Sequence, residues 1–229
     1  EDMVLTITRS GYIKRNPISL YTSQHRGGKG KVAMGTREDD FVEHFFVAST
    51  HHTFMFITNF GKVYQVKVYE LPMAGRSSIG KSIANFLNLD PEEHLATVLT
   101  VPEFSQGKYV VMATRKGRVK KTELMAYSRP RSGGLIGVKL AEDDELIAAR
   151  ITDGNMEILL GSLDGKVIRF HENDIRCTAR GSMGVKGMAL GEGASVVGME
   201  TLSRSMTLLC VTENGFGKRT SVEEYRQQS

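Results

Sequence analysis

The sequence contains no tryptophan, only two cysteines and only five prolines among its 229 residues. Two cysteines cannot supply the disulfide framework that stabilises small secreted domains, so we expect a reducing compartment, the cytoplasm. No apolar run approaches the ~18–20 residues of a transmembrane helix and no signal peptide opens the chain, so we expect no membrane partner. The absence of tryptophan also separates the chain from WD-type propellers, which usually carry it in each blade.

Patterns that hold metals or perform catalysis are missing as well. The six histidines show no H-x₃-H spacing, and no C-x-x-C occurs. Acidic pairs such as Asp39-Asp40 and Glu92-Glu93 recur at equivalent points of the chain, where acidic turns are ordinary. No Ser-His-Asp or Cys-His arrangement is legible. We therefore predict no catalytic residue, metal or cofactor here, and a chain that is not an enzyme by itself.

Glycine, by contrast, is abundant, with 24 residues, and it marks a repeated turn. Each turn follows a short apolar run and precedes a basic residue; the five are Thr8–Gly11, Thr58–Gly61, Thr114–Gly117, Ser162–Gly165 and Thr212–Gly215. Their glycines are 50, 56, 48 and 50 residues apart. Strand, glycine turn and second strand is a hairpin pattern, so the spacing predicts one β-hairpin in each of five repeats.

The second half of each repeat also recurs. Gly134–Leu146 matches Gly184–Ala194, Ile83–Leu87 is a looser counterpart, and a β-like run follows each of them. About four strands per ~50 residues, with no sustained 3.6-residue apolar period, predicts an all-β, propeller-like fold of four-stranded blades with almost no helix.

We predict a single domain over residues 1–229, with repeats at roughly 1–50, 51–105, 106–153, 154–202 and 203–229. The fifth repeat is incomplete, which gives about four and a half blades. Because the chain opens on Glu1 and stops soon after a strand-like unit, we interpret it as a fragment of something longer.

One segment, Gly75–Ser82, fits the Walker A motif of an ATPase letter for letter. A working P-loop needs a buried strand before it and a helix after it, whose N-terminus cradles phosphate. Pro72 and Pro91 flank this stretch, and no convincing Walker B aspartate is present. We therefore interpret the segment as one of a family of basic glycine loops, and ATP binding is the weakest of the functional hypotheses.

The basic residues recur in register, and the net charge of +4 favours a polyanionic partner. We define a hairpin set, at or just after the turns: Lys14, Arg15, Lys62, Arg115, Lys116, Arg118, Lys120, Lys121, Lys166, Arg169, Lys218 and Arg219. We define a glycine-loop set, one group in each repeat: Arg26, Lys29, Lys31, Arg76, Lys81, Arg129, Arg131, Arg180 and Lys186. Acidic residues favour a different loop, so we expect the charges to be segregated and all of these cations to form a track for a bent polyanion.

The first glycine loop carries the most specific signal. Its residues are Gln24, His25, Arg26, Gly27, Gly28, Lys29 and Gly30, three glycines among potentially cationic side chains. The heptad closely resembles the Gln-Arg-Arg-Gly-Gly-Lys-Gly box of the DNA gyrase A C-terminal domain family, with His25 replacing the first arginine. Similarity extends along essentially the whole chain, for example through Lys67–Pro72, Gly165–Phe170 and Gly215–Thr220.

This resemblance implies a β-pinwheel, normally of six four-stranded blades, that binds double-stranded DNA and wraps it around its rim so that gyrase introduces negative supercoils. It implies that the box, Gln24–Gly30, is the part most tied to supercoiling. The implied partners are the gyrase B subunit, together with the N-terminal domain of the gyrase A subunit; ATP and Mg²⁺ would be used by those other parts. Two alternatives stay open: the C-terminal domain of the A subunit of topoisomerase IV, and a propeller that binds another protein.

Overall fold

The computed structural model describes residues 1–21, 32–202 and 206–228. The chain divides into two compact units, one of residues 1–58, 62–104 and 130–135, the other of residues 59–61, 105–129 and 136–229. The described residues form β-strands and short 3₁₀-helices, without any α-helix, which confirms the all-β prediction. None of the helices in these residues is long and apolar enough to cross a membrane.

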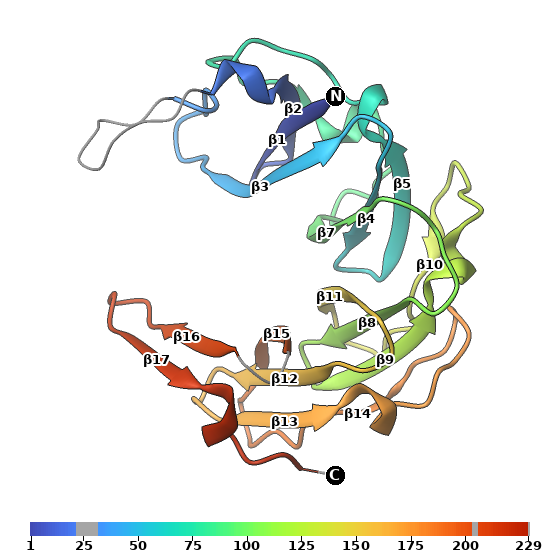
Figure 1. Ribbon diagram of the computed structural model, residues 1–229, viewed down its shortest axis with the longest axis vertical. Helices are drawn as coiled ribbons and strands as arrows, with labels where there is room; N and C mark the ends of the chain where they lie inside the picture. The colour runs from blue at the N-terminus through green and yellow to red at the C-terminus, as the bar shows by residue number, and fades with distance from the viewer. Residues whose placement is uncertain (22–31, 203–205, 229) are drawn as a thin grey trace. The chain divides into compact units, whose positions relative to one another are not determined.

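The first unit contains two antiparallel sheets (Figure 1). One has the order β3-β1-β2-β6, from β1 (Asp2–Thr8), β2 (Tyr12–Pro17), β3 (Val42–Ser49) and β6 (Lys81–Ser82). The other has the order β10-β5-β4-β7, from β4 (Thr53–Thr58), β5 (Lys62–Lys67), β7 (Leu95–Val101) and β10 (Leu135–Ile136). Single turns of 3₁₀-helix, η1 (Ile18–Leu20), η2 (Val68–Glu70) and η3 (Ile83–Asn85), follow β2, β5 and β6.

The second unit contains three further sheets. The first, β11-β8-β9-β14, is built from β8 (Tyr109–Thr114), β9 (Arg118–Glu123), β11 (Leu146–Thr152) and β14 (Val185–Lys186). The second, β13-β12-β15, is built from β12 (Glu157–Ser162), β13 (Val167–His171) and β15 (Val196–Leu202), and the third from β16 (Thr207–Val211) and β17 (Gly217–Ser221). The 3₁₀-turns here are η4 (Leu124–Tyr127), η5 (Glu172–Asp174) and η6 (Val222–Glu224).

The five predicted hairpins are confirmed, and one local device recurs at their turns. In the first, the Gly11 amide donates to the Thr8 carbonyl at 2.9 Å with φ of +80° at Gly11, a conformation that glycine adopts without steric cost. The Thr8 hydroxyl then accepts the amide of Tyr12 at 3.1 Å. A hydroxyl at the first position and a glycine three residues later therefore recur because each closes one side of the turn.

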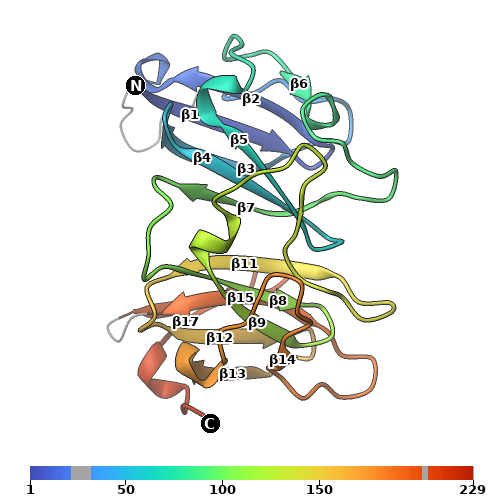
Figure 2. The same cartoon turned by 90° about the vertical axis from the view of Figure 1, so that its right-hand side faces the viewer.

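Each four-stranded sheet takes its outer strand from the following repeat, a feature that the sequence repeats did not predict. In the first repeat β2 lies beside β6 (Figure 2). The two strands pair through Tyr12 opposite Ser82 and Ile13 opposite Lys81. In the third repeat β9 pairs with β14 in the same antiparallel way, through Val119 opposite Val185. The outer strands are two residues long, so they give the sequence no periodicity from which their pairing could be read.

Each unit has its own apolar core, made where the sheets face each other. In the first unit Leu5, Ile7, Phe54 and Phe56 are fully buried, and the Phe54 and Phe56 rings meet edge to face with centroids 5.9 Å apart. The core of the second unit includes Ile158 and its neighbours on β8, β9 and β15. Strands β1 and β4 are buried on both faces, which explains their nearly continuous apolar sequence.

Candidate nucleic-acid interface

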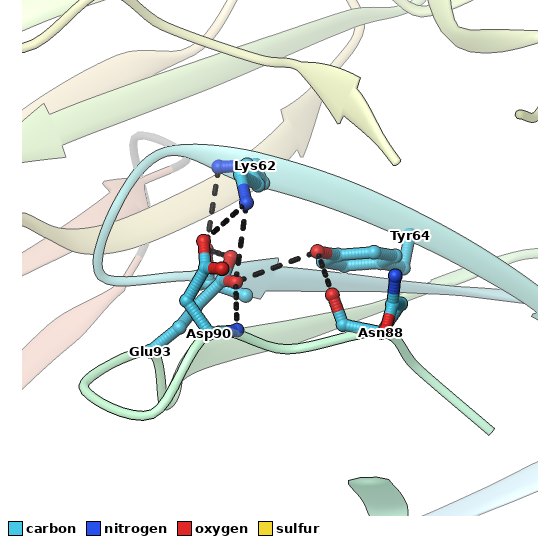
Figure 3. A network of polar contacts seen from close by, with 6 residues as sticks. Lys62, Tyr64, Asn88, Asp90 and Glu93 are labelled. Carbon is cyan, nitrogen blue, oxygen red and sulfur yellow. Dashed lines mark hydrogen bonds and ion pairs between the residues drawn. The ribbon is translucent and has the colours of Figure 1, made fainter. Parts of the chain in front are cut away.

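Three cations at the hairpin turns lie beside carboxylates. Lys62, in the hairpin of β4 and β5, places its Nζ 2.8 Å from Asp90 and 3.4 Å from Glu93 (Figure 3). Glu93 is buried and also accepts the Thr58 hydroxyl at 2.7 Å. The hydrogen bond to Asp90 raises the pKa of Lys62 above its ordinary value, against the opposing effect of burial and with help from the Glu93 charge. Lys62 is thus a paired cation.

The same pairing recurs at the third and fourth hairpins. Arg115 lies 2.7 Å from Glu145, and Lys166 lies 2.8 Å from Asp164. The acidic loop folds over the turn because its carboxylates accept turn amides, as Asp144 does from Lys116 at 2.9 Å. The expected segregation of charge is therefore wrong at the hairpin end, since residues far apart in sequence meet there. Sequence reasoning did not place these carboxylates beside the cations, although the recurrence of acidic residues at equivalent points of the repeats was the available signal.

Three cations predicted to lie on an exposed rim are instead buried, and this prediction is corrected. Lys14, Lys120 and Lys121 expose 0%, 1% and 4% of their surface. All three lie on β-strands, neighbouring segments cover their alkyl stems, and each ammonium is hydrogen-bonded inside the fold. Lys121 pairs with the buried Glu172 at 2.9 Å. None of the three is available to a phosphate in this structure.

Three half-buried arginines of the hairpin set bind backbone carbonyls of the following repeat. Arg15 donates to the carbonyl oxygens of Leu71 at 2.8 Å and Tyr69 at 3.0 Å. Arg118 donates to the carbonyl of Gly184 at 2.8 Å. Arg169 pairs with Glu157 at 2.8 Å and donates to the carbonyls of Val222 and Tyr225, all within the second unit. These arginines join one repeat to the next.

The glycine-loop set behaves differently. Lys81, Arg129, Arg131 and Lys186 are exposed, Arg76 and Arg180 are half-buried, and across residues 32–202 no carboxylate pairs with any of the six. Lys81 and Lys186 lie on the outer strands β6 and β14, and Arg129 and Arg131 lie just before β10. Lys218 and Arg219, the exposed pair on β17, also lack a carboxylate partner in the described part of the chain. Positive charge is therefore unneutralised beside the outer strands.

The loop at Gly75–Ser82 does not have the geometry of a P-loop. Its carbonyl oxygens at Gly75, Arg76 and Ser78 turn inward and accept from the Lys14 ammonium, whereas a P-loop turns amides toward phosphate. The three-residue η3 follows it instead of an α-helix. Gly80, with φ of +84°, lies against the Ile13 carbonyl, which a Cβ would approach to 2.5 Å. This loop packs against the first hairpin, and its geometry agrees with the interpretation of the segment as a glycine loop and not a P-loop.

The box heptad Gln24–Gly30 and the neighbouring Lys31 lie outside the described residues. Their predicted part in DNA binding stays a prediction. In the described part of the chain, no group of three or more His, Cys, Asp or Glu side chains could hold a metal ion.

Antiparallel sheets that take their outer strands from the following repeat define the class of this protein as a propeller-like all-β repeat. A family model described as "DNA gyrase C-terminal domain, beta-propeller" matches residues 2–49, 52–102, 108–153, 157–203 and 207–229. The chain belongs to the DNA gyrase C-terminal domain family.

Relatives in sequence are the A subunits of DNA gyrase. The whole chain is 43% identical over 229 residues to the DNA gyrase A subunit of Escherichia coli (strain K12), covering 26% of that protein. It is 47% identical over 228 residues to the DNA gyrase A subunit of Clostridium acetobutylicum, covering 28%. The chain thus spans about a quarter of the length of these relatives.

Solved structures agree with this family. A structure described as that of the DNA gyrase A C-terminal domain covers the whole chain with a TM-score of 0.82 at 28% identity, over 74% of that structure's chain. A C-terminal domain of DNA topoisomerase IV matches with the same TM-score and identity, over 70% of its chain. The two structures match the fold equally well, so it is the sequence relatives that indicate gyrase.

Proposed function

We propose that this chain binds double-stranded DNA through its glycine-loop cations and bends the duplex as a wrapping module of the DNA gyrase A subunit. The single observation that supports this most is the contrast between the two cation sets. Cations beside the outer strands lack carboxylate partners in the described part of the chain, whereas Lys62, Arg115 and Lys166 at the hairpin turns are paired with carboxylates. Lys14, Lys120 and Lys121 of the hairpin set are buried. Membership of the gyrase family agrees with the proposal.

Binding would be electrostatic and independent of base sequence. Each phosphate neutralised by Lys or Arg releases condensed counterions, so the logarithm of the binding constant falls by about 0.9 per contact for each logarithmic unit of salt. The glycine-loop cations Arg76, Lys81, Arg129, Arg131, Arg180 and Lys186 would together give a slope of about −5. Flexible lysines and arginines that reach phosphates carry no information about the bases.

Distributed contacts are what bending requires. The persistence length of duplex DNA is ~150 bp, and bending 20–30 bp by 40–90° costs about 1–6 kcal/mol. A single loop cannot offset that cost, but several loops, one in each repeat, can share it. The repeat is therefore the functional unit that we propose, with each glycine loop holding one stretch of the backbone.

The remaining functions follow from the proposed place in gyrase. The box Gln24–Gly30 would be required for chiral wrapping more than for affinity. The N-terminal domain of the gyrase A subunit, with the gyrase B subunit, would be the partners in the cytoplasm and would carry out strand passage with ATP and Mg²⁺. The chain itself would contribute no catalytic residue.

The test is relaxation of a closed plasmid by topoisomerase I in the presence of the chain, followed by a two-dimensional gel of the topoisomers. We expect a positive shift in linking number that grows with protein concentration. Binding without any shift would contradict wrapping by this chain alone. A filter-binding titration of random duplex at varied salt separates this proposal from a protein-binding propeller, which would show neither affinity nor a salt slope.

A further inference from the structure

Lys14 and Lys120 occupy the same place in two different repeats. Both lie in the second strand of a hairpin, where Lys14 is opposite Thr6 and Lys120 is opposite Met112. Each is covered almost completely by the glycine loop of the next repeat, residues 74–80 over Lys14 and residues 178–184 over Lys120. Each arrangement lies within one unit, so the geometry is seen twice independently.

Both ammonium groups donate to backbone carbonyls of those loops, Lys14 to three carbonyls and Lys120 to one, while the second acceptor of Lys120, Gly137, lies in its own repeat. Lys14 Nζ donates to Gly75 at 3.0 Å, to Ser78 at 2.9 Å and also to Arg76. An ammonium has three N–H donors, so these three carbonyls use all of them. Lys120 Nζ donates to the Arg180 carbonyl at 2.7 Å and to that of Gly137. In both loops one of the bonded carbonyls belongs to an arginine of the glycine-loop set.

Burying an ammonium group is energetically unfavourable. Burying a charge costs several kcal/mol unless it is paired, and across the described residues no carboxylate contacts either lysine. Accordingly, burial lowers the pKa of both lysines. The equivalent positions of the second and fourth repeats carry Tyr64 and Ile168, opposite Phe56 and Leu160, so the strand does not require a lysine there.

We propose that Lys14 and Lys120 are positioning residues that fix the conformation of loops 74–80 and 178–184 and thereby hold Arg76 and Arg180 at DNA phosphates. The inference rests on the proposed function, because a fixed loop can hold these arginines at phosphates only if the chain binds DNA. The carbonyls that bind each buried ammonium point into the fold. The loop that precedes β10 has Gly134 against the Tyr64 ring instead, so its Arg129 and Arg131 are not held in this way.

The test compares Lys14→Met and Lys120→Met, because methionine keeps most of the stem and removes the charge. Removing the donors and removing the buried charge act in opposite directions, so we expect each variant to stay folded with a Tm within about 5 °C of the wild type. Hydrogen exchange read by mass spectrometry should accelerate in residues 178–184 of Lys120→Met and not in residues 74–80. Lys14→Met should show the reverse.

DNA affinity is measured by anisotropy of a labelled duplex at several salt concentrations. Each variant should lose about one phosphate contact, seen as a five- to tenfold weaker affinity near 0.1 M salt and a salt slope lower by about one. The double variant Lys120→Met/Arg180→Gln should bind no more weakly than Arg180→Gln alone. Lys166→Met is the charge-matched control, because Lys166 is paired with Asp164, and it should change neither loop exchange nor affinity.

Unfolding of either methionine variant would overturn the proposal, because the lysine would then be required for stability and not for the loop. Unchanged exchange in both loops would also overturn it, as would altered exchange with unchanged DNA affinity. If the wild-type chain failed to bind duplex at all, the proposed function would fail, and the exchange measurements would still decide whether the lysines fix the loops.

Discussion

The hairpin cations and the glycine-loop cations use the same two residue types at the same repeat spacing, yet their surroundings differ. At the hairpins a carboxylate lies within 2.8 Å of Lys62 and of Lys166. At the glycine loops Lys81 and Lys186 are exposed and no carboxylate pairs with them among the described residues. The comparison teaches that register alone does not identify a binding surface, because the same periodicity places cations where acidic loops neutralise them.

The strongest test of this comparison removes the same number of positive charges from the glycine-loop cations and from the paired cations. We expect the variant with Lys81, Arg129, Arg131 and Lys186 all changed to Gln to lose affinity for duplex DNA on the order of 10³-fold near 0.1 M salt, with a slope lower by about four. The matched variant changes Lys62, Arg115, Lys166 and Arg150, which pairs with Glu200, to Gln and should bind within about threefold of the wild type, because each of these cations is paired with a carboxylate. Filter binding across a salt series measures both. Equal losses in the two variants would show that net charge, and not its location, governs binding.

A second contrast compares a buried ion pair with an exposed one. Glu172→Gln leaves Lys121 buried beside a neutral group and should lower the free energy of unfolding by about 3–5 kcal/mol. Asp164→Asn, at the exposed pair with Lys166, should lower it by less than about 1 kcal/mol. Urea denaturation measures both values. Similar losses would mean that burial does not distinguish these pairs.

A third contrast compares two glycines of one loop. At Gly184, with φ of +76°, a Cβ would come within 2.3 Å of the Val119 carbonyl oxygen, whereas at Gly181 it would meet nothing within 4 Å. We expect Gly184→Ala to lower the free energy of unfolding by about 2 kcal/mol through strain and collision. Gly181→Ala should stay within about 0.5 kcal/mol of the wild type. Thermal unfolding of the two variants measures both free energies. A larger loss of stability at Gly181 than at Gly184 would contradict the described loop geometry.

A last contrast concerns pH and one buried cation. Burial, with a further contribution from the Arg180 charge and an opposing one from Cys177, lowers the pKa of Lys120 to about 8 from an ordinary value of 10.5. Between these pH values the unfolded chain binds a proton that the folded chain has lost, so stability should rise with pH, by at most about 1.4 kcal/mol per unit. Lys120→Met should lack this contribution. Urea denaturation from pH 7.5 to 10.5 measures the free energy of unfolding of both proteins, and the difference between the two values should change across that window. Parallel curves would contradict the lowered pKa.

Much of the fold could be predicted because its signals are local. A hydroxyl residue at Thr8 and a glycine at Gly11 close a turn within four residues, and that device reappears at Thr114 and Gly117. The outer strands could not be predicted, because β6 and β14 are two residues long and pair with strands of the preceding repeat. In the candidate site, the exposure of Lys81 and Lys186 agrees with the sequence interpretation, and the burial of Lys120 does not.

The sequence by itself determined the repeat, the hairpins, the absence of α-helix from the described residues and the family, since each depends on residue types at short or regular spacing. Only the tertiary structure decided which cations are free. Lys120 and Arg131 look equivalent in a list of basic residues, but the buried Lys120 ammonium donates to the carbonyls of Gly137 in its own repeat and Arg180 in the next, and the Arg131 side chain is exposed. Charge neutralisation and burial depend on contacts between distant segments, and no local pattern records them.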